Sequence, residues 1–148
     1  MSSKEETRAA YPHIQAITTR WMDNDVYGHV NNVQYYSYFD TVVNQWLVER
    51  GLLDYQNSEV IGLVIETSCA YFSPIAFPDV VQAGLRVARI GNSSIRYEVG
   101  LFRNDEDTVS AAGHFIHVYV DRKTNRPVRV PDAMREALAE IQSIQTNN

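Results

Sequence analysis

The stretch "NNVQYYSYFDTVVNQWLVERG", residues 31–51, decides the fold. Its apolar residues recur at steps of three and four, which is the period of an α-helix with a buried face. That stripe consists of Tyr36, Phe39, Val43, Trp46 and Leu47, with Arg50 at the next step, and is widened by Tyr35, Tyr38 and Val42. An asparagine at 31 or 32 suits a helix N-cap, and Gly51 suits the position just after a helix end. We therefore predict one long, largely buried helix over residues 33–50.

Strand-like runs lie on both sides of this helix. Residues 13–23 are rich in β-branched side chains and predict a first strand. Four runs of alternating apolar and polar residues follow the helix, around 63–71, 81–87, 95–101 and 109–120. Short polar turns between them indicate antiparallel hairpins, and Pro131 opens a short closing helix. Because the apolar face of the sheet needs cover, we predict an α+β fold whose antiparallel sheet wraps around one long central helix.

Composition bounds the class of protein. A chain of 148 residues fits one domain, which we place at 13–148 after a disordered tail at 1–12. A net charge of −5 argues against non-specific nucleic-acid binding. The single cysteine, Cys69, excludes an intramolecular disulfide, the first ten residues lack the apolar core of a secretory signal, and no apolar run could span a bilayer. We expect a cytoplasmic protein with no membrane insertion.

The segment before the helix concentrates polar residues: "DNDVYGHVNN", residues 23–32. In one interpretation it is a capping loop, in which Asp23 and Asp25 accept loop amides and Gly28 supplies an unusual backbone angle. In the other, a carboxylate activates water or attacks a carbonyl, and the unpaired amides at the helix start stabilise the oxygen that gains charge. The spacing alone leaves both open.

The same segment resembles the D-x-D-x-x-G-H-V-N-N signature of the 4-hydroxybenzoyl-CoA thioesterase-like family of hotdog-fold enzymes. "YFSPIAFPDVV" at 71–81 and "VYVDRKTNRPVRVP" at 118–131 resemble later segments of that family. The resemblance implies a hotdog fold and hydrolysis of an acyl-CoA thioester to a carboxylic acid and CoA. Because one short sheet cannot fully enclose the helix, we expect two sheets to pair edge to edge in a homodimer or a homotetramer. The resemblance implies active sites at the subunit interface. No metal or organic cofactor is implied, because coenzyme A is part of the substrate.

Carried over residue by residue, the resemblance makes Asp25 the catalytic carboxylate. The backbone N–H of Asn32 or Val33 would bind the thioester oxygen, and Gly28, His29 and Asn31 would support the site. Family members use the aspartate either as a nucleophile or as a base for water, and the sequence does not choose between these roles. For His29, orienting the substrate and simply bonding loop backbone remain equal alternatives.

Other polar residues carry weaker signals. His114 and His117 lie three apart on a predicted strand, so they point to opposite faces and form a poor metal pair. Two arginine-rich sets could meet CoA phosphates or could be solvated surface: Arg86, Arg89 and Arg96, and Arg122, Lys123, Arg126 and Arg129. Two rival functions are a non-catalytic binder of CoA thioesters and, less favoured, a hotdog dehydratase or hydratase. Neither the acyl group nor the choice between CoA and an acyl-carrier protein follows from the sequence.

Overall fold

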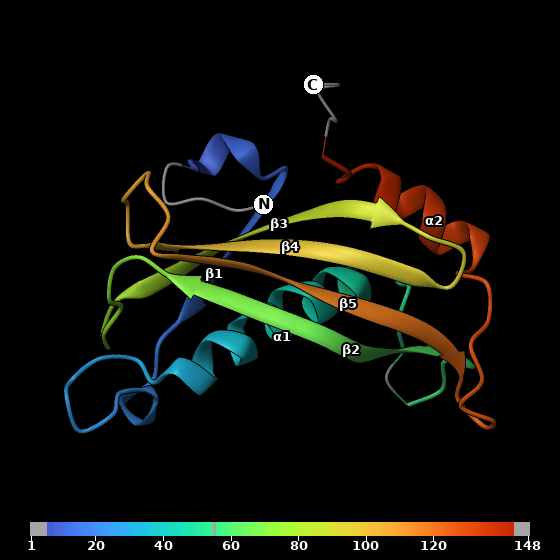
Figure 1. Ribbon diagram of the computed structural model, residues 1–148, viewed down its shortest axis with the longest axis horizontal. Coiled ribbons are helices and arrows are strands. Elements are labelled where there is room, and N and C mark those ends of the chain that lie inside the picture. Colours follow the sequence, from blue (N-terminus) through green and yellow to red (C-terminus); the bar gives the residue numbers. More distant parts are fainter. Residues whose placement is uncertain (1–5, 55, 144–148) are drawn as a thin grey trace.

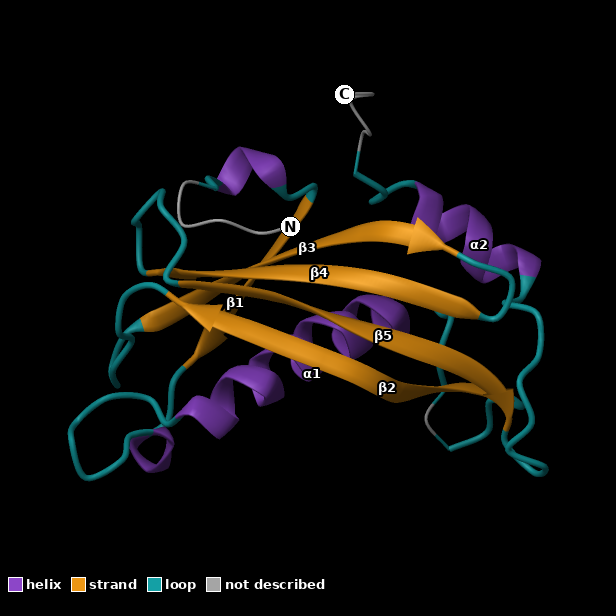
Figure 2. Cartoon of the chain, viewed as in Figure 1, coloured by secondary structure: helices purple, strands orange, loops and turns teal. Residues whose placement is uncertain are grey.

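The computed structural model describes residues 6–54 and 56–143. Its strands are β1 (His13–Thr18), β2 (Val60–Tyr71), β3 (Val80–Ile90), β4 (Ser94–Arg103) and β5 (Ala111–Asp121). Its α-helices are α1 (Asn32–Glu49) and α2 (Asp132–Ala139), and two short 3-10 helices, η1 (Arg8–Ala10) and η2 (Trp21–Asp23), flank β1. The five strands form one antiparallel sheet in the order β1-β3-β4-β5-β2 (Figures 1 and 2).

Helix α1 lies across one face of this sheet, as Figure 1 shows. Its stripe enters the core because steps of three and four keep Phe39, Val43 and Trp46 on one side, all at most 2 % exposed. Side chains of alternate residues in β3, β4 and β5 complete the same cluster, which α2 closes with Met134 and Leu138. The predicted hotdog arrangement, a sheet around one central helix, is confirmed.

The outer face of the sheet is also partly covered, which the sequence-based prediction missed. Residues 6–12 pack over β3 and β4, where the ring of Tyr11 lies against two glycines that face each other in register, Gly84 and Gly100. A Cβ at either glycine would come within 2.6 Å of that ring. The expectation of a disordered tail is therefore wrong for residues 6–12, because glycines leave room for an aromatic ring. Residues 1–5 lie outside the described part.

The first strand is shorter than predicted. β1 ends at Thr18, and the chain then turns into η2 instead of continuing to residue 23. The Asp23 carboxylate accepts the Arg20 N–H at 2.9 Å and its guanidinium Nε–H at 3.0 Å, which closes that turn. Local hydrogen bonding has overridden the β propensity of the run.

Strand β2 forms one edge of the sheet and remains largely exposed. A bulge separates Val64 from Glu66, and Leu63, Val64 and Ile65 are 42 %, 49 % and 62 % exposed. The alternation over 63–71 predicts a half-buried strand, but Leu63 and Ile65 are exposed in this single chain, where β2 is an edge strand. Among the described residues, no helix is long and apolar enough to cross a bilayer.

Candidate active site

The loop between η2 and α1 is a compact hairpin centred on Asp25. Asn24 and Val30 form an antiparallel bridge, and the Asp25 N–H donates to the His29 carbonyl at 2.8 Å. Gly28 donates back to the Asp25 carbonyl at 3.0 Å with φ of +80°, a conformation that glycine adopts without strain. The predicted need for an unusual backbone angle at Gly28 is confirmed.

The carboxylate of Asp25 has one oxygen anchored. Its Oδ1 accepts the Tyr27 N–H at 2.8 Å, and no described residue donates to its other oxygen. The side chain is half-buried and borders an open hollow of about 630 Å³, lined by Trp21, Met22, Asn24, Val26 and Gly28. The Asp25 carboxylate is therefore held in place and still has a free oxygen.

Asp23, the other carboxylate of the pair, is fully engaged instead. It is 1 % exposed and accepts the Tyr38 hydroxyl at 2.8 Å in addition to its bonds from Arg20. Burial alone would raise the pKa of Asp23, but the hydrogen bonds from Arg20 and Tyr38 outweigh it and lower that pKa below its ordinary value. Asp23 thus ties the loop to the first turns of α1.

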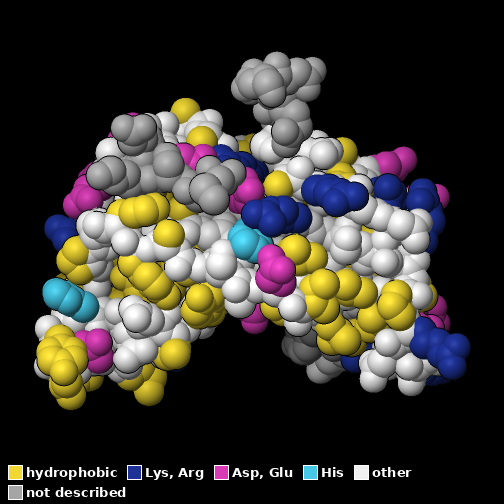
Figure 3. Space-filling view, viewed as in Figure 1, with side chains coloured by type: hydrophobic (Ala, Val, Ile, Leu, Met, Phe, Trp, Pro, Cys, Tyr) yellow, Lys and Arg dark blue, Asp and Glu magenta, His cyan; other side chains and the backbone are white. Residues whose placement is uncertain are grey.

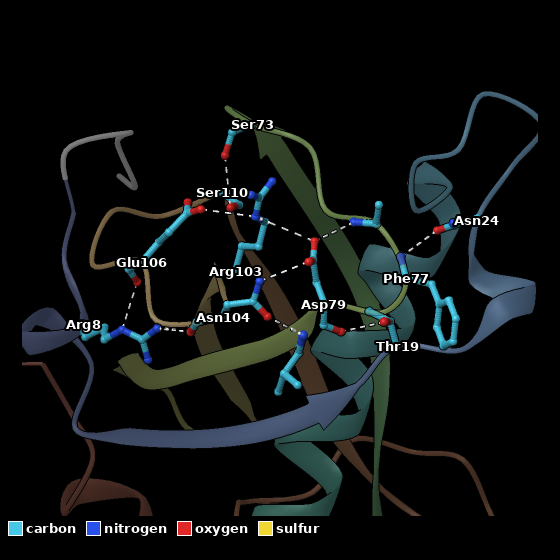
Figure 4. A network of polar contacts seen from close by, with 12 residues as sticks. Arg8, Thr19, Asn24, Ser73, Phe77, Asp79, Arg103, Asn104, Glu106 and Ser110 are labelled. Carbon is cyan, nitrogen blue, oxygen red and sulfur yellow. Dashed lines mark hydrogen bonds and ion pairs between the residues drawn. The ribbon is translucent and has the colours of Figure 1, made fainter.

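A second segment, residues 75–79, braces this loop from the side. The Val30 N–H donates to the Ile75 carbonyl at 2.7 Å, and the Phe77 N–H donates to Asn24 Oδ1 at 3.0 Å. Asp79 holds the bracing segment by accepting the Ala76 N–H at 3.0 Å (Figure 4). The loop between β2 and β3, far from the hairpin in sequence, therefore fixes the position of Asp25.

The start of α1 offers one free amide. Asn31 is the N-cap, and its side-chain oxygen accepts the Val33 N–H at 3.0 Å. Of the two amides considered for the oxyanion, Val33 is therefore already satisfied, while no described residue accepts the N–H of Asn32. The side chain of His29 is exposed and makes no hydrogen bond to Asp25 within the described residues.

A groove runs beside α1. It has a volume of about 380 Å³ and lies between α1 and the edge of β2. Its lining residues are Tyr36, Ser37, Phe39, Asp40, Val64, Thr67 and Phe115. Asn32, Tyr36 and Asp40 are spaced by four residues, so they share one face of the helix. The groove thus continues along the face that begins with the free amide, although Asp25 does not itself line it.

The family of the chain follows from a comparison with known families. Residues 19–138 match the family described as the thioesterase-like superfamily. The chain belongs to the thioesterase-like superfamily. The matched range begins just before η2 and ends inside α2, so it contains the Asp25 hairpin, α1 and the whole groove.

Solved structures of related proteins agree with this membership. The PA5185 protein of Pseudomonas aeruginosa is 55 % identical, with a TM-score of 0.92 over 95 % of this chain and 99 % of that one. PA2801 of the same organism, whose proposed activity is that of a thioesterase, is 32 % identical, with a TM-score of 0.79 over 86 % and 98 %. An Agrobacterium fabrum protein named L-carnitine dehydrogenase/betainyl-CoA thioesterase is 23 % identical over 92 % of this chain and 28 % of its own length.

The arginine and histidine candidates from the sequence can also be placed in this thioesterase-like protein. Arg86 is buried on the outer face between Glu6 and Glu98, each 2.8 Å from its guanidinium, so it is not available to a phosphate. His117 is 3 % exposed on the helix side, whereas His114 faces outward, so the predicted separation of the two histidines is confirmed. No group of three or more metal-ligating side chains is found among the described residues.

Proposed function

We propose that this protein hydrolyses an acyl-CoA thioester to a free carboxylic acid and CoA. The observation that carries the proposal is the placement of Asp25. One oxygen of its carboxylate is hydrogen-bonded and the other is not, and its hairpin leads directly into α1, where no described residue accepts the N–H of Asn32. A thioester carbonyl gains negative charge when attacked, and a helix N-terminus stabilises that charge through its unpaired N–H group and dipole.

Asp25 supplies the reacting oxygen in either of two ways. As a base, its unbonded oxygen takes a proton from water, which attacks the carbonyl carbon. As a nucleophile, it attacks that carbon directly, CoA thiolate leaves, and water then hydrolyses the anhydride. In both cases the bond to the Tyr27 N–H fixes the carboxylate, and the Asn32 N–H binds the developing oxyanion.

The groove beside α1 would receive the acyl group. If the thioester oxygen of the substrate accepts the Asn32 N–H, its acyl chain extends along the helix face that carries Tyr36 and Asp40. The aromatic rings of Tyr36 and Phe39 together with the Asp40 carboxylate suit a quaternary ammonium group, which both kinds of side chain attract. Betainyl-CoA, the substrate in the name of the Agrobacterium relative, therefore belongs in the substrate panel beside short, aromatic and long acyl-CoAs.

A second copy of the chain would complete the site. The exposed edge of β2 has unpaired backbone groups and exposes Leu63, Val64 and Ile65, and such an edge pairs readily with another strand. Because Val64 and Thr67 of β2 line the groove, β2–β2 pairing in a homodimer would wall its open side. We expect a dimer, or a tetramer of two dimers, by light scattering, and a monomer with reduced turnover for Ile65→Lys.

The test is release of CoA thiol from the acyl-CoA panel by the parent and Asp25→Asn. The asparagine can still accept the Tyr27 N–H through its side-chain oxygen, so the hairpin should keep its shape. We expect loss of at least about 100-fold in kcat, as for removal of a catalytic acid or base. Asp105→Asn, in the exposed turn after β4, is the matched control and should be unchanged. Binding of acyl-CoA without turnover by the parent would contradict the proposal and favour a non-catalytic binder.

A further inference from the structure

The outer face of the sheet holds a hydrogen-bonded trio that the proposed function does not use. Ser68 on β2 lies directly opposite His114 on β5, so both side chains leave the same face of the sheet. The Ser68 hydroxyl oxygen is 2.9 Å from His114 Nδ1. The other ring nitrogen, Nε2, is 2.7 Å from the carboxylate of Glu66. One imidazole therefore connects a hydroxyl with a carboxylate.

The chemistry of the three groups fixes the direction of these hydrogen bonds. An ionised carboxylate only accepts, so Nε2 carries the proton that it donates to Glu66. In the neutral imidazole, His114 Nδ1 is then the acceptor, and Ser68 donates its hydroxyl proton to it. A serine that donates to an imidazole held by a carboxylate is the arrangement that activates serine as a nucleophile.

Two members of the trio, Ser68 and His114, border a cavity. A hollow of about 390 Å³ on the outer face is lined by Ser68, His114, Arg96 and Glu98, over the small residues Ala70 and Ala112. Arg96 contacts Glu98 through its Nε at 3.6 Å, and no other described residue accepts from its guanidinium. Figure 3 views this outer face and shows histidine, acidic and basic side chains gathered near its middle. A cation therefore lines the space beside the serine.

We propose that Ser68, His114 and Glu66 form a second acyl-transfer site, independent of Asp25, that hydrolyses small carboxylic esters. Ser68 Oγ attacks the ester carbonyl carbon while its proton passes to His114 Nδ1, and Glu66 stabilises the imidazolium. The oxyanion forms beside Arg96. When it collapses, the C–O bond breaks and His114 returns the proton to the departing alkoxide, which releases an alcohol. Water then cleaves the acyl-serine by the same route and releases the acid. The cavity volume suits short acyl groups.

The experiment uses the full chain carrying Asp25→Asn, which separates this site from the proposed thioesterase site. The purified protein is treated with a fluorophosphonate probe and, separately, assayed for hydrolysis of p-nitrophenyl acetate and butyrate. We expect a single adduct mapped to Ser68 and ester hydrolysis that falls about 100-fold in Ser68→Ala and in His114→Gln, the size of a general-base contribution. Glu66→Gln, which removes the charge that stabilises the imidazolium, should lower the rate about 10-fold.

Ser73→Ala is the matched control, because Ser73 is an exposed serine that bonds Ser110 and not a histidine. Its labelling and ester hydrolysis should equal those of the Asp25→Asn parent. Thermal unfolding midpoints of all variants establish that the fold is kept, and Ser68→Ala removes only one exposed hydroxyl. Absence of a Ser68 adduct, or ester hydrolysis that is the same with and without the Ser68 hydroxyl, would overturn the proposal. Failure of the thioesterase assay would not affect it.

Discussion

The Tyr38 hydroxyl donates a 2.8 Å hydrogen bond to the buried carboxylate of Asp23, and this bond joins helix α1 to the loop that carries Asp25. The two residues are fifteen apart in sequence, and Tyr38 is 4 % exposed. A buried bond to a charged acceptor is among the stronger hydrogen bonds in proteins. The position of Asp25 therefore depends on a helix residue that does not touch the hairpin tip.

Tyr38→Phe should weaken this connection. We expect the free energy of unfolding to fall by roughly 1.5–3 kcal/mol, the value of a hydrogen bond to a charged group. The loss should be present at neutral pH and fade in acid, because a lowered Asp23 pKa stabilises the fold above the ordinary value of 3.8 and loses that effect as pH falls further. Denaturant unfolding at several pH values measures it. Tyr27→Phe, on a side chain that is 83 % exposed, is the control; equal losses in both variants would contradict the assignment.

Asn31→Ala should remove the N-cap of α1. The Val33 N–H loses its acceptor, so we expect about 1 kcal/mol less stability and a lower rate of thiol release, because the helix start is less well fixed beside Asp25. Asn31→Ser keeps an oxygen that can accept the same N–H and should restore both quantities. A serine variant as impaired as the alanine variant would show that the cap is not the cause.

Much of the fold could be predicted from the sequence because burial leaves a local pattern. The helical period predicted a helix over 33–50, and each end of α1 lies within one residue of that range. The alternation over 95–101 predicted β4, in which Ile95, Tyr97, Val99 and Leu101 are all buried. The order strand, helix, four strands, helix then allowed few arrangements. These features survive in a single sequence because each depends on residues close together in the chain.

What could not be predicted depends on contacts between distant segments. The packing of Tyr11 on the outer face of the sheet could have been suspected only from the glycines at 84 and 100. Their pairing becomes known only when the register of β3 and β4 is known. The motif singled out Asp25 but did not show that Asn31 occupies the Val33 amide. The exposure of β2 could not be predicted, because its alternation of apolar and polar residues is typical of a half-buried strand. The roles of Asp25 and Asn32 remain predictions.

Ser37→Phe should shorten the groove beside α1. Ser37 lines the groove of about 380 Å³, and a phenyl ring there would occupy the space that a large acyl group needs. We expect kcat/KM to fall about tenfold or more for long or aromatic acyl-CoAs and to change little for acetyl-CoA. Thr41→Phe, one turn further along α1 at an exposed position, adds the same ring outside the groove lining. A Ser37→Phe variant whose substrate range matches that of Thr41→Phe would place the acyl group elsewhere.

The buried His117 should make stability depend on pH in mild acid. Burial lowers the pKa of His117 from 6.5 to about 4, since its ring is enclosed on the helix side of β5. Between these two values the unfolded chain binds a proton that the folded protein does not, so stability falls as pH decreases from about 6.5 to about 4. The full effect of one such group is about 3 kcal/mol, spread over that window. Denaturant midpoints measured at half-unit steps from pH 7 to pH 4 would show the slope. His117→Asn, which keeps a polar side chain but cannot titrate, should make it shallower and leave the contribution of His13, whose pKa burial also lowers. His114→Asn, on the opposite face of the same strand, is the matched control, and a slope that disappears there but persists in His117→Asn would contradict the assignment.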